Sequence, residues 1–161
     1  KTSGHLNCSL YEREILKSES KKNPPQVDLK LEKKHSELVR HLIVDGLINA
    51  CHDVSDGGIL VALFEMSSVK LGVKIADEFL KTNSDVNALL FGEDQGRYII
   101  SVSDAKIKNS TDFLLHLAQD LGVELFKIGE VVESKIEIAG NSVSLQELQD
   151  LNEAVFPSKF S

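Results

Sequence analysis

Apolar residues recur along much of the chain three or four positions apart, the spacing of one face of a helix. Several of these apolar stripes are preceded by a side chain that can cap a helix and followed by a glycine that can end it. Asp28 is placed to cap the longest stripe and Gly46 to end it, while Ser144 with Glu147 resembles a capping box. The pattern predicts helices over residues 9–18, 28–44, 57–71, 85–90, 104–121 and from 144 to before Pro157.

Shorter runs between these stripes predict strands. The β-branched and aromatic run over residues 97–102 is typical of a central strand. Gly140 and Asn141 separate two short apolar runs, as in a tight hairpin turn. The predicted strands cover residues 48–53, 73–75, 97–102, 125–132, 135–138 and 142–145. Strands and helices alternate but the last strands form a hairpin, so we predict an α+β fold with a mixed sheet covered by helices.

The segment from His52 to Gly58 reads His-Asp-Val-Ser-Asp-Gly-Gly and precedes the most apolar helix stripe. We interpret it as a strand end, a tight acidic turn and a helix start, in which Gly57 and Gly58 let the backbone approach a neighbour closely. The carboxylates of Asp53 and Asp56 disfavour a bare anion and suit Mg2+, which prefers carboxylate oxygens together with phosphates. The alternative, more frequent interpretation is an ordinary acidic helix cap.

Composition and charge narrow the function classes. The chain has 161 residues, of which 42% are hydrophobic, and a net charge of −7, which indicates a globular protein and disfavours a nucleic-acid binder. No apolar run approaches the roughly 18 residues of a membrane helix, and no secretory signal pattern opens the chain. Cys8 and Cys51 have no metal or disulfide spacing and predict free thiols in a reducing, cytoplasmic compartment. Because Met66 is the only methionine and none opens the chain, we expect a piece of a longer protein or a processed product.

Several common catalytic patterns are absent from the sequence. It has no zinc-type histidine spacing, no nucleophile elbow and no Walker loop. His52, at the end of a predicted strand, is interpreted as a packing histidine. Cys51 has no neighbour that would favour its thiolate. Glu93, Asp94 and Gln95, taken alone, predict only a turn before a strand.

Four stretches together resemble one family. They are Gly4–Leu16, His52–Met66, Leu90–Tyr98 and Leu151–Pro157. In this order they are similar to the C-terminal part of phosphoribosylformylglycinamidine synthase, in its small multi-subunit form, a member of the aminoimidazole ribonucleotide (AIR) synthetase superfamily. Asn7 stands where that family usually has glycine; asparagine tolerates left-handed backbone, so the turn is expected to persist.

The resemblance implies a fold and an activity. It implies a three-layer α+β domain with partly ferredoxin-like topology over residues 28–161, preceded by a lead-in helix and linker over residues 1–27. The whole enzyme would be an ATP- and glutamine-dependent ligase that converts formylglycinamide ribonucleotide to formylglycinamidine ribonucleotide in purine biosynthesis. Most catalytic groups would lie upstream, so the chain alone is expected to be inactive and to carry no catalytic residue.

The resemblance also implies site residues, cofactors and partners. Asp53 and Ser55 would bind ATP or ADP at an auxiliary site, with Asp53 as a ligand of Mg2+ and Gly57 and Gly58 in the same turn. Glu93 and Gln95 match a turn that contacts substrate in the other half of the enzyme. Expected partners are the upstream domains, a glutaminase subunit and a small accessory subunit.

Two alternatives remain open from the sequence. One is a non-catalytic, partner-binding module of the same fold. The other is a different enzyme of the superfamily, such as thiamine-monophosphate or selenophosphate kinase. The run from Phe91 to Arg97 argues against those kinases, because it matches the synthase.

Overall fold

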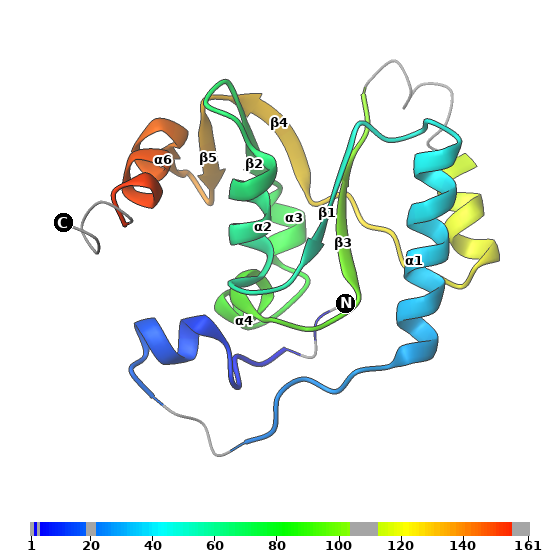
Figure 1. The fold of residues 1–161 in the computed structure, drawn as a ribbon, viewed down its shortest axis with the longest axis horizontal. Coiled ribbons are helices and arrows are strands. Elements are labelled where there is room, and N and C mark those ends of the chain that lie inside the picture. Colours follow the sequence, from blue (N-terminus) through cyan, green and yellow to red (C-terminus); the bar gives the residue numbers. More distant parts are fainter. Residues whose placement is uncertain (1, 3, 19–21, 104–112, 156–161) are drawn as a thin grey trace. The chain divides into compact units, whose positions relative to one another are not determined.

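The structure is a computed structural model that describes residues 2, 4–18, 22–103 and 113–155. The chain forms two compact units (Figure 1). The first comprises Lys1–Ala62 and Asp85–Phe126, and the second comprises Leu63–Ser84 and Lys127–Ser161. The predicted division between residues 27 and 28 falls inside the first unit and stays a prediction. Phe156 and Pro157 lie outside the described residues, as does the predicted helix start at Asp104.

The first unit combines helices with a two-stranded antiparallel sheet of β1 and β3. Its named elements are the π-helix η1 (Tyr11–Ile15), α1 (Leu29–Val44), β1 (Ala50–Val54), the start of α2 (Gly58–Met66), α4 (Val86–Phe91) and β3 (Arg97–Ser101). Residues 113–120 are also helical, and Gly122 follows them with a φ of 63°. The helices predicted over 9–18, 28–44 and 85–90 are confirmed, the first as a single wide turn.

Both ends of α1 are built as the sequence predicts. The Asp28 side chain accepts hydrogen bonds from the backbone N–H groups of Lys30 and Leu31, so it satisfies two otherwise unpaired donors. At the other end Gly46 adopts a φ of 64°, in the left-handed region. Its N–H donates to the Ile43 carbonyl at 3.1 Å, and the next N–H, of Leu47, donates to the Leu42 carbonyl at 2.9 Å. These two bonds form a Schellman motif, which ends the helix.

One hydrophobic core cluster of the first unit lies between α1 and the helical residues 113–120. Its buried members are Leu38, Leu42, Leu114 and Ala118. Ile100 of β3 is among the partly buried residues that pack against them. The prediction of a central strand over 97–102 is wrong in one respect: within the described residues, β3 has only β1 as a hydrogen-bonded neighbour. A run of β-branched residues indicates that the side chains of a strand are buried, not that the strand has a neighbour on each side. Here helices bury part of these side chains.

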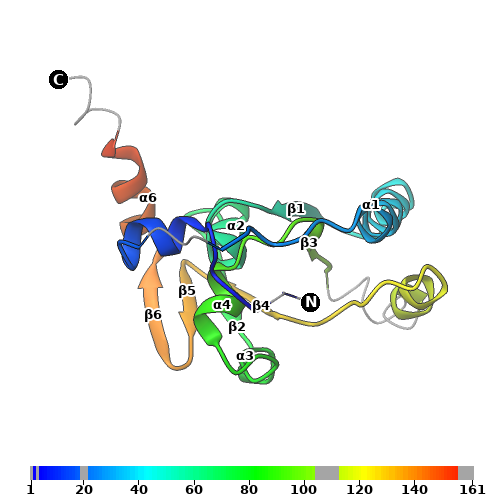
Figure 2. The ribbon, with the colours of Figure 1, turned by 90° about the horizontal axis from the view of Figure 1, so that it is seen from below.

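The second unit is organised on a four-stranded sheet in the order β4-β2-β5-β6 (Figure 2). Its elements are β2 (Leu71–Ile75), α3 (Asp77–Leu80), β4 (Gly129–Glu133), β5 (Lys135–Ile138), β6 (Asn141–Ser144) and α6 (Leu145–Glu153). The pair β2–β5 is parallel and the other two pairs are antiparallel. The sheet is therefore mixed, as predicted, and the α+β class is confirmed.

Gly72 has a different role from the one predicted. The helix predicted over 57–71 ends at Met66, and Leu71 and Gly72 begin β2. A Cβ on Gly72 would lie 1.9 Å from the Lys135 carbonyl oxygen, so the parallel pairing with β5 requires glycine here. The apolar run suggested a longer helix because the partner strand β5 is distant in sequence. Its pairing with β2 cannot be predicted from the residues around Gly72.

Two further boundaries in the second unit differ from the sequence prediction. The strand predicted over 125–132 begins only at Gly129, because Leu125 packs against the core of the first unit. The hairpin turn lies at Ala139 and Gly140, with φ of 49° and 78°, one residue before the predicted Gly140–Asn141 pair. The short helix α3 was not predicted; no side-chain cap marks its start.

Substitution of Asp28 tests the construction of α1. We expect Asp28→Ala to lower the free energy of unfolding by about 1 kcal/mol, because two N–H groups lose their acceptor. Asp28→Asn retains an acceptor oxygen and serves as the matched control, with most of the stability kept. Urea unfolding followed by circular dichroism measures both. Equal losses in the two variants would contradict the role given to the acceptor oxygen of Asp28.

Candidate functional site

The segment from His52 to Gly58 forms the predicted turn between β1 and α2. Val54, the last residue of β1, is buried and anchors it. Gly57 and Gly58 both adopt left-handed backbone, with φ of 77° and 72°. The Gly58 N–H donates to the Ser55 carbonyl at 3.1 Å. The tight glycine turn is thus confirmed as a backbone structure.

Gly58 also allows a close approach between two segments of the first unit. A Cβ at this position would lie 2.7 Å from both the Leu90 carbonyl oxygen and the Phe91 Cα. Both atoms belong to the backbone at the end of α4 and cannot move aside as a flexible side chain does. The start of α2 and the end of α4 therefore meet through their main chains.

Glu93 is the side chain that the structure brings to this turn. One of its carboxylate oxygens, Oε1, accepts a hydrogen bond from the Gly57 N–H at 2.8 Å. The same oxygen accepts a second bond, also of 2.8 Å, from the Leu10 N–H in the segment before η1. Three stretches that the sequence singled out separately are joined at one oxygen atom.

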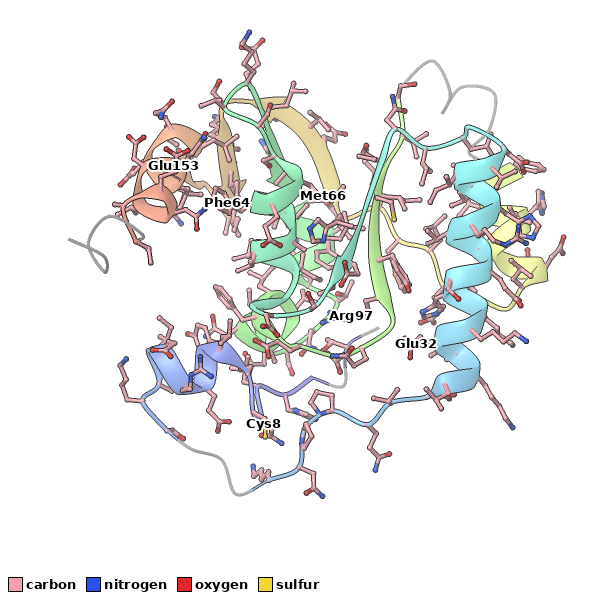
Figure 3. The ribbon with its side chains drawn as sticks, in the orientation of Figure 1. Cys8, Glu32, Phe64, Met66, Arg97 and Glu153 are labelled. Atoms are coloured by element: carbon pink, nitrogen blue, oxygen red, sulfur yellow. The ribbon has the colours of Figure 1, made fainter. Side chains whose placement is uncertain are left out.

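Arg97 fixes the loop that carries Glu93 (Figure 3). Its guanidinium donates to the Gly92 carbonyl at 2.6 Å and to the Asp94 carbonyl at 3.2 Å, and it lies 3.4 Å from the Asp94 carboxylate. Both side chains of the ion pair are only 11% exposed. Burial lowers the pKa of Arg97, although the Asp94 charge opposes that change. The Thr2 hydroxyl donates to the same carboxylate at 2.5 Å.

Neighbouring elements support this loop from two further directions. His35 of α1 bonds through Nδ1 to the Gly96 carbonyl at 2.5 Å, and since a carbonyl only accepts, Nδ1 carries the proton. The Tyr11 ring of η1 stacks on Phe91, with the ring centroids 4.6 Å apart. The loop over residues 92–97 is held at each end and in its middle.

The acidic side chains of the turn have a different environment from Glu93. The Asp53 side chain is 65% exposed, and Asp56 is also exposed. The His52 Nδ1 lies 2.6 Å from the Asp53 carbonyl oxygen and 3.7 Å from its carboxylate. Tyr98 is the cross-strand partner of Asp53. Its pKa is raised chiefly by burial, with smaller contributions from the charges of Glu32, Asp53 and Cys51.

Cys51 fits the prediction of an unreactive thiol. Burial raises its pKa, and the nearby charge of Asp53 raises it further. A thiol with a raised pKa holds less thiolate at neutral pH and is a poorer nucleophile. Cys8 is exposed, and both cysteines are free.

The groups at the turn that could bind a nucleotide-bound magnesium ion are carboxylate oxygen atoms. Asp53 offers one exposed carboxylate, which suits an ion that keeps waters and takes further ligands from phosphates. Among the described residues no group of three or more metal-ligating side chains occurs. The Gly57 and Gly58 N–H groups already have acceptors in the chain. Gln95 is exposed at the tip of the loop.

The sequence interpretation missed the supporting residues Arg97, Asp94 and His35. The signal for Asp94 and Arg97 was present: a charged pair spaced three residues apart at the start of a strand. Nothing local marks His35, because its partner Gly96 is 61 positions away in sequence. No helix of the described residues is long and apolar enough to span a membrane.

Comparison with known proteins identifies what the chain is similar to. Residues 3–140 match the family described as AIR synthase related protein, C-terminal domain. The phosphoribosylformylglycinamidine synthase subunit PurL of Bartonella tribocorum is 40% identical over 154 residues, which cover 95% of this chain and 20% of the relative. The subunit of the same name from Zymomonas mobilis is 36% identical over 157 residues. The chain thus spans about a fifth of the length of these relatives.

Solved structures of the same kind share the fold. Phosphoribosylformylglycinamidine synthase II from Thermotoga maritima has a TM-score of 0.64 at 21% identity, over 77% of this chain and 22% of that one. T. maritima PurL complexed with AMPPCP has a TM-score of 0.62 at 21% identity, over 76% of this chain and 22% of that one.

Gly58 provides a test of the backbone approach at the turn. We expect Gly58→Ala to lower the free energy of unfolding by about 3 kcal/mol, from left-handed strain together with a clash against immovable backbone. Gly46→Ala is the matched control, because Gly46 is also left-handed but has no atom within 4 Å of its added Cβ. That variant should lose about 1 kcal/mol. Chemical unfolding compares them, and similar losses would remove the close-approach argument.

Proposed function

The chain belongs to the family of AIR synthase related proteins, of which it carries the C-terminal domain, and we propose that it is this domain of a phosphoribosylformylglycinamidine synthase subunit. The observation that carries the proposal is the 40% identity to the Bartonella subunit, sustained over 95% of the chain. The proposed domain covers residues 28–161, with residues 1–27 as its lead-in. The non-catalytic and kinase alternatives have no comparable observation in their favour.

The proposed activity belongs to the whole enzyme. It is the ATP- and glutamine-dependent conversion of formylglycinamide ribonucleotide to the corresponding amidine, a carbon–nitrogen ligation in purine biosynthesis. A T. maritima PurL has been solved in complex with FGAR, and another with AMPPCP. This chain supplies no catalytic residue in our proposal; it supplies one wall of a nucleotide site, and alone it is inactive.

The turn from His52 to Gly58 is the proposed nucleotide-binding element. Asp53 would hold Mg2+, and the Ser55 side chain would contact the nucleotide. The ion neutralises phosphate charge when bound. Gly57 and Gly58 would contribute their backbone shape, since their N–H groups already have acceptors within the chain. Gln95, exposed beside Glu93, is the proposed substrate-side contact of the loop.

The proposed partners follow from the same assignment. They are the upstream domains of the polypeptide, a glutaminase subunit and a small accessory subunit, in the cytoplasm. Part of one chain in a structure of PurLQS from T. maritima shares the fold of this chain, with a TM-score of 0.61 at 21% identity over 22% of that chain.

A chimeric enzyme tests the proposed function. The chain replaces the matching segment of the Bartonella tribocorum subunit, and the chimera is expressed in a bacterium that lacks its own synthase subunit. We expect growth without added purines, because a segment 40% identical over 95% of this chain should fold in the same way in the chimera. The same chimera carrying Gly58→Ala is the control and should fail to support growth. A soluble, stable chimera that does not restore growth would contradict the proposal.

Asp53→Asn tests the proposed metal ligand separately. Because Asp53 is exposed, the substitution should change the stability of the isolated chain by less than about 0.5 kcal/mol. In the chimera it should reduce the thermal protection that Mg-ADP provides. Asp45→Asn, at an exposed carboxylate after α1, is the matched control. Undiminished protection in Asp53→Asn would contradict the proposed metal role, and unfolding of the isolated chain by this change would assign Asp53 a structural role instead.

A further inference from the structure

The Gly57 N–H points to a position that an acidic side chain of the same chain already fills. Left-handed glycines at the start of a helix expose N–H groups that commonly bind a phosphate or another anion. Here the Glu93 Oε1 lies 2.8 Å from the Gly57 nitrogen, the distance of a charge-assisted hydrogen bond. A ligand oxygen bound to this N–H would have to replace that carboxylate.

Two further sets of contacts hold the Glu93 carboxylate at this position. Its second bond, from the Leu10 N–H, fixes Oε1 from the opposite segment. The loop that carries Glu93 is fixed in turn by the buried pair of Arg97 and Asp94. The bond from Leu10 and the fixed loop already restrict the rotamers of the Glu93 side chain. Its bond with the Gly57 N–H therefore costs less additional rotamer entropy.

We propose that Glu93 is the built-in anion of the glycine turn and a positioning residue of the nucleotide site. Its carboxylate takes the place of a phosphate at Gly57 and joins the lead-in segment at Leu10 to the turn. Phosphates of a nucleotide would then approach through Asp53 and its Mg2+ and not through the N–H groups of the turn. The last statement rests on the proposed function; the role of Glu93 in the isolated chain does not.

Chemical rescue tests this role in the 161-residue chain. Glu93→Ala removes the acceptor of two N–H groups, and we expect its melting temperature to fall by on the order of 10 °C. Formate supplies a small carboxylate of the right chemistry. It should restore a substantial part of that loss relative to chloride at equal ionic strength. Wild type and Gly58→Ala, which is destabilised by a clash, should show no such recovery.

Glu93→Gln provides a second measurement if the alanine variant does not fold. The amide oxygen of glutamine can still accept from both nitrogens, so this variant should lose less than half as much in melting temperature. In nitrogen–proton NMR spectra, the Gly57 and Leu10 amide protons should both move to higher field, because a neutral acceptor replaces a charged one. General destabilisation would not move these two resonances together.

Inorganic phosphate distinguishes an occupied turn from an open one. In the wild-type chain, phosphate should leave the Gly57 amide resonance unmoved, whereas in Glu93→Ala it should shift it. The inference is overturned if phosphate shifts this resonance in wild type, or if formate stabilises Gly58→Ala as much as Glu93→Ala. It is also overturned if only one of the two amide resonances responds to Glu93→Gln. Failure of the chimera to support growth would leave all these results unchanged.

Discussion

The first unit depends on the sharing of one carboxylate oxygen between two backbone N–H groups. Buried or half-buried backbone donors must find acceptors, and a turn made of left-handed glycines cannot pair its donors in a regular helix or strand. Glu93 satisfies Gly57 in the turn and Leu10 in the lead-in segment, so a single side chain connects two N–H groups whose residues are 36 and 83 positions away from it. Without it, the turn and the lead-in would each need a separate acceptor.

This requirement explains why the loop from Gly92 to Arg97 is so extensively bonded. A carboxylate on a flexible loop gains little from a hydrogen bond, because ordering the loop costs entropy. Arg97 bonds two carbonyls of the loop and pairs with Asp94, and His35 bonds the carbonyl of Gly96. None of these contacts involves the Glu93 side chain, so they hold the loop independently of the bonds that Glu93 makes. The buried ion pair is better understood as a way to position the loop than as a source of stability.

The sequence predicted the features that depend on residues close together in the chain and missed those that depend on residues far apart. The cap at Asp28 and the stop at Gly46 were predictable, because each depends on bonds between residues at most five positions apart. The end of α2 and the start of β4 were not. They depend on the carbonyl of Lys135 beside Gly72 and on the burial of Leu125, and both partners are distant in sequence.

The same distinction applies to the candidate site. The sequence alone predicted a magnesium ligand at Asp53, a tight backbone turn at the two glycines and only a turn at Glu93, and the family resemblance added a substrate contact for Glu93. Whether an acidic side chain binds a ligand or the protein's own backbone depends on what the fold places against it. Glu93 faces two N–H groups within the chain, whereas Asp53 remains 65% exposed. The Gly57 N–H of the turn is already bonded to Glu93, and the Asp53 and Asp56 carboxylates of the turn are exposed. The turn is therefore suited to a cation with its phosphates and not to a bare anion.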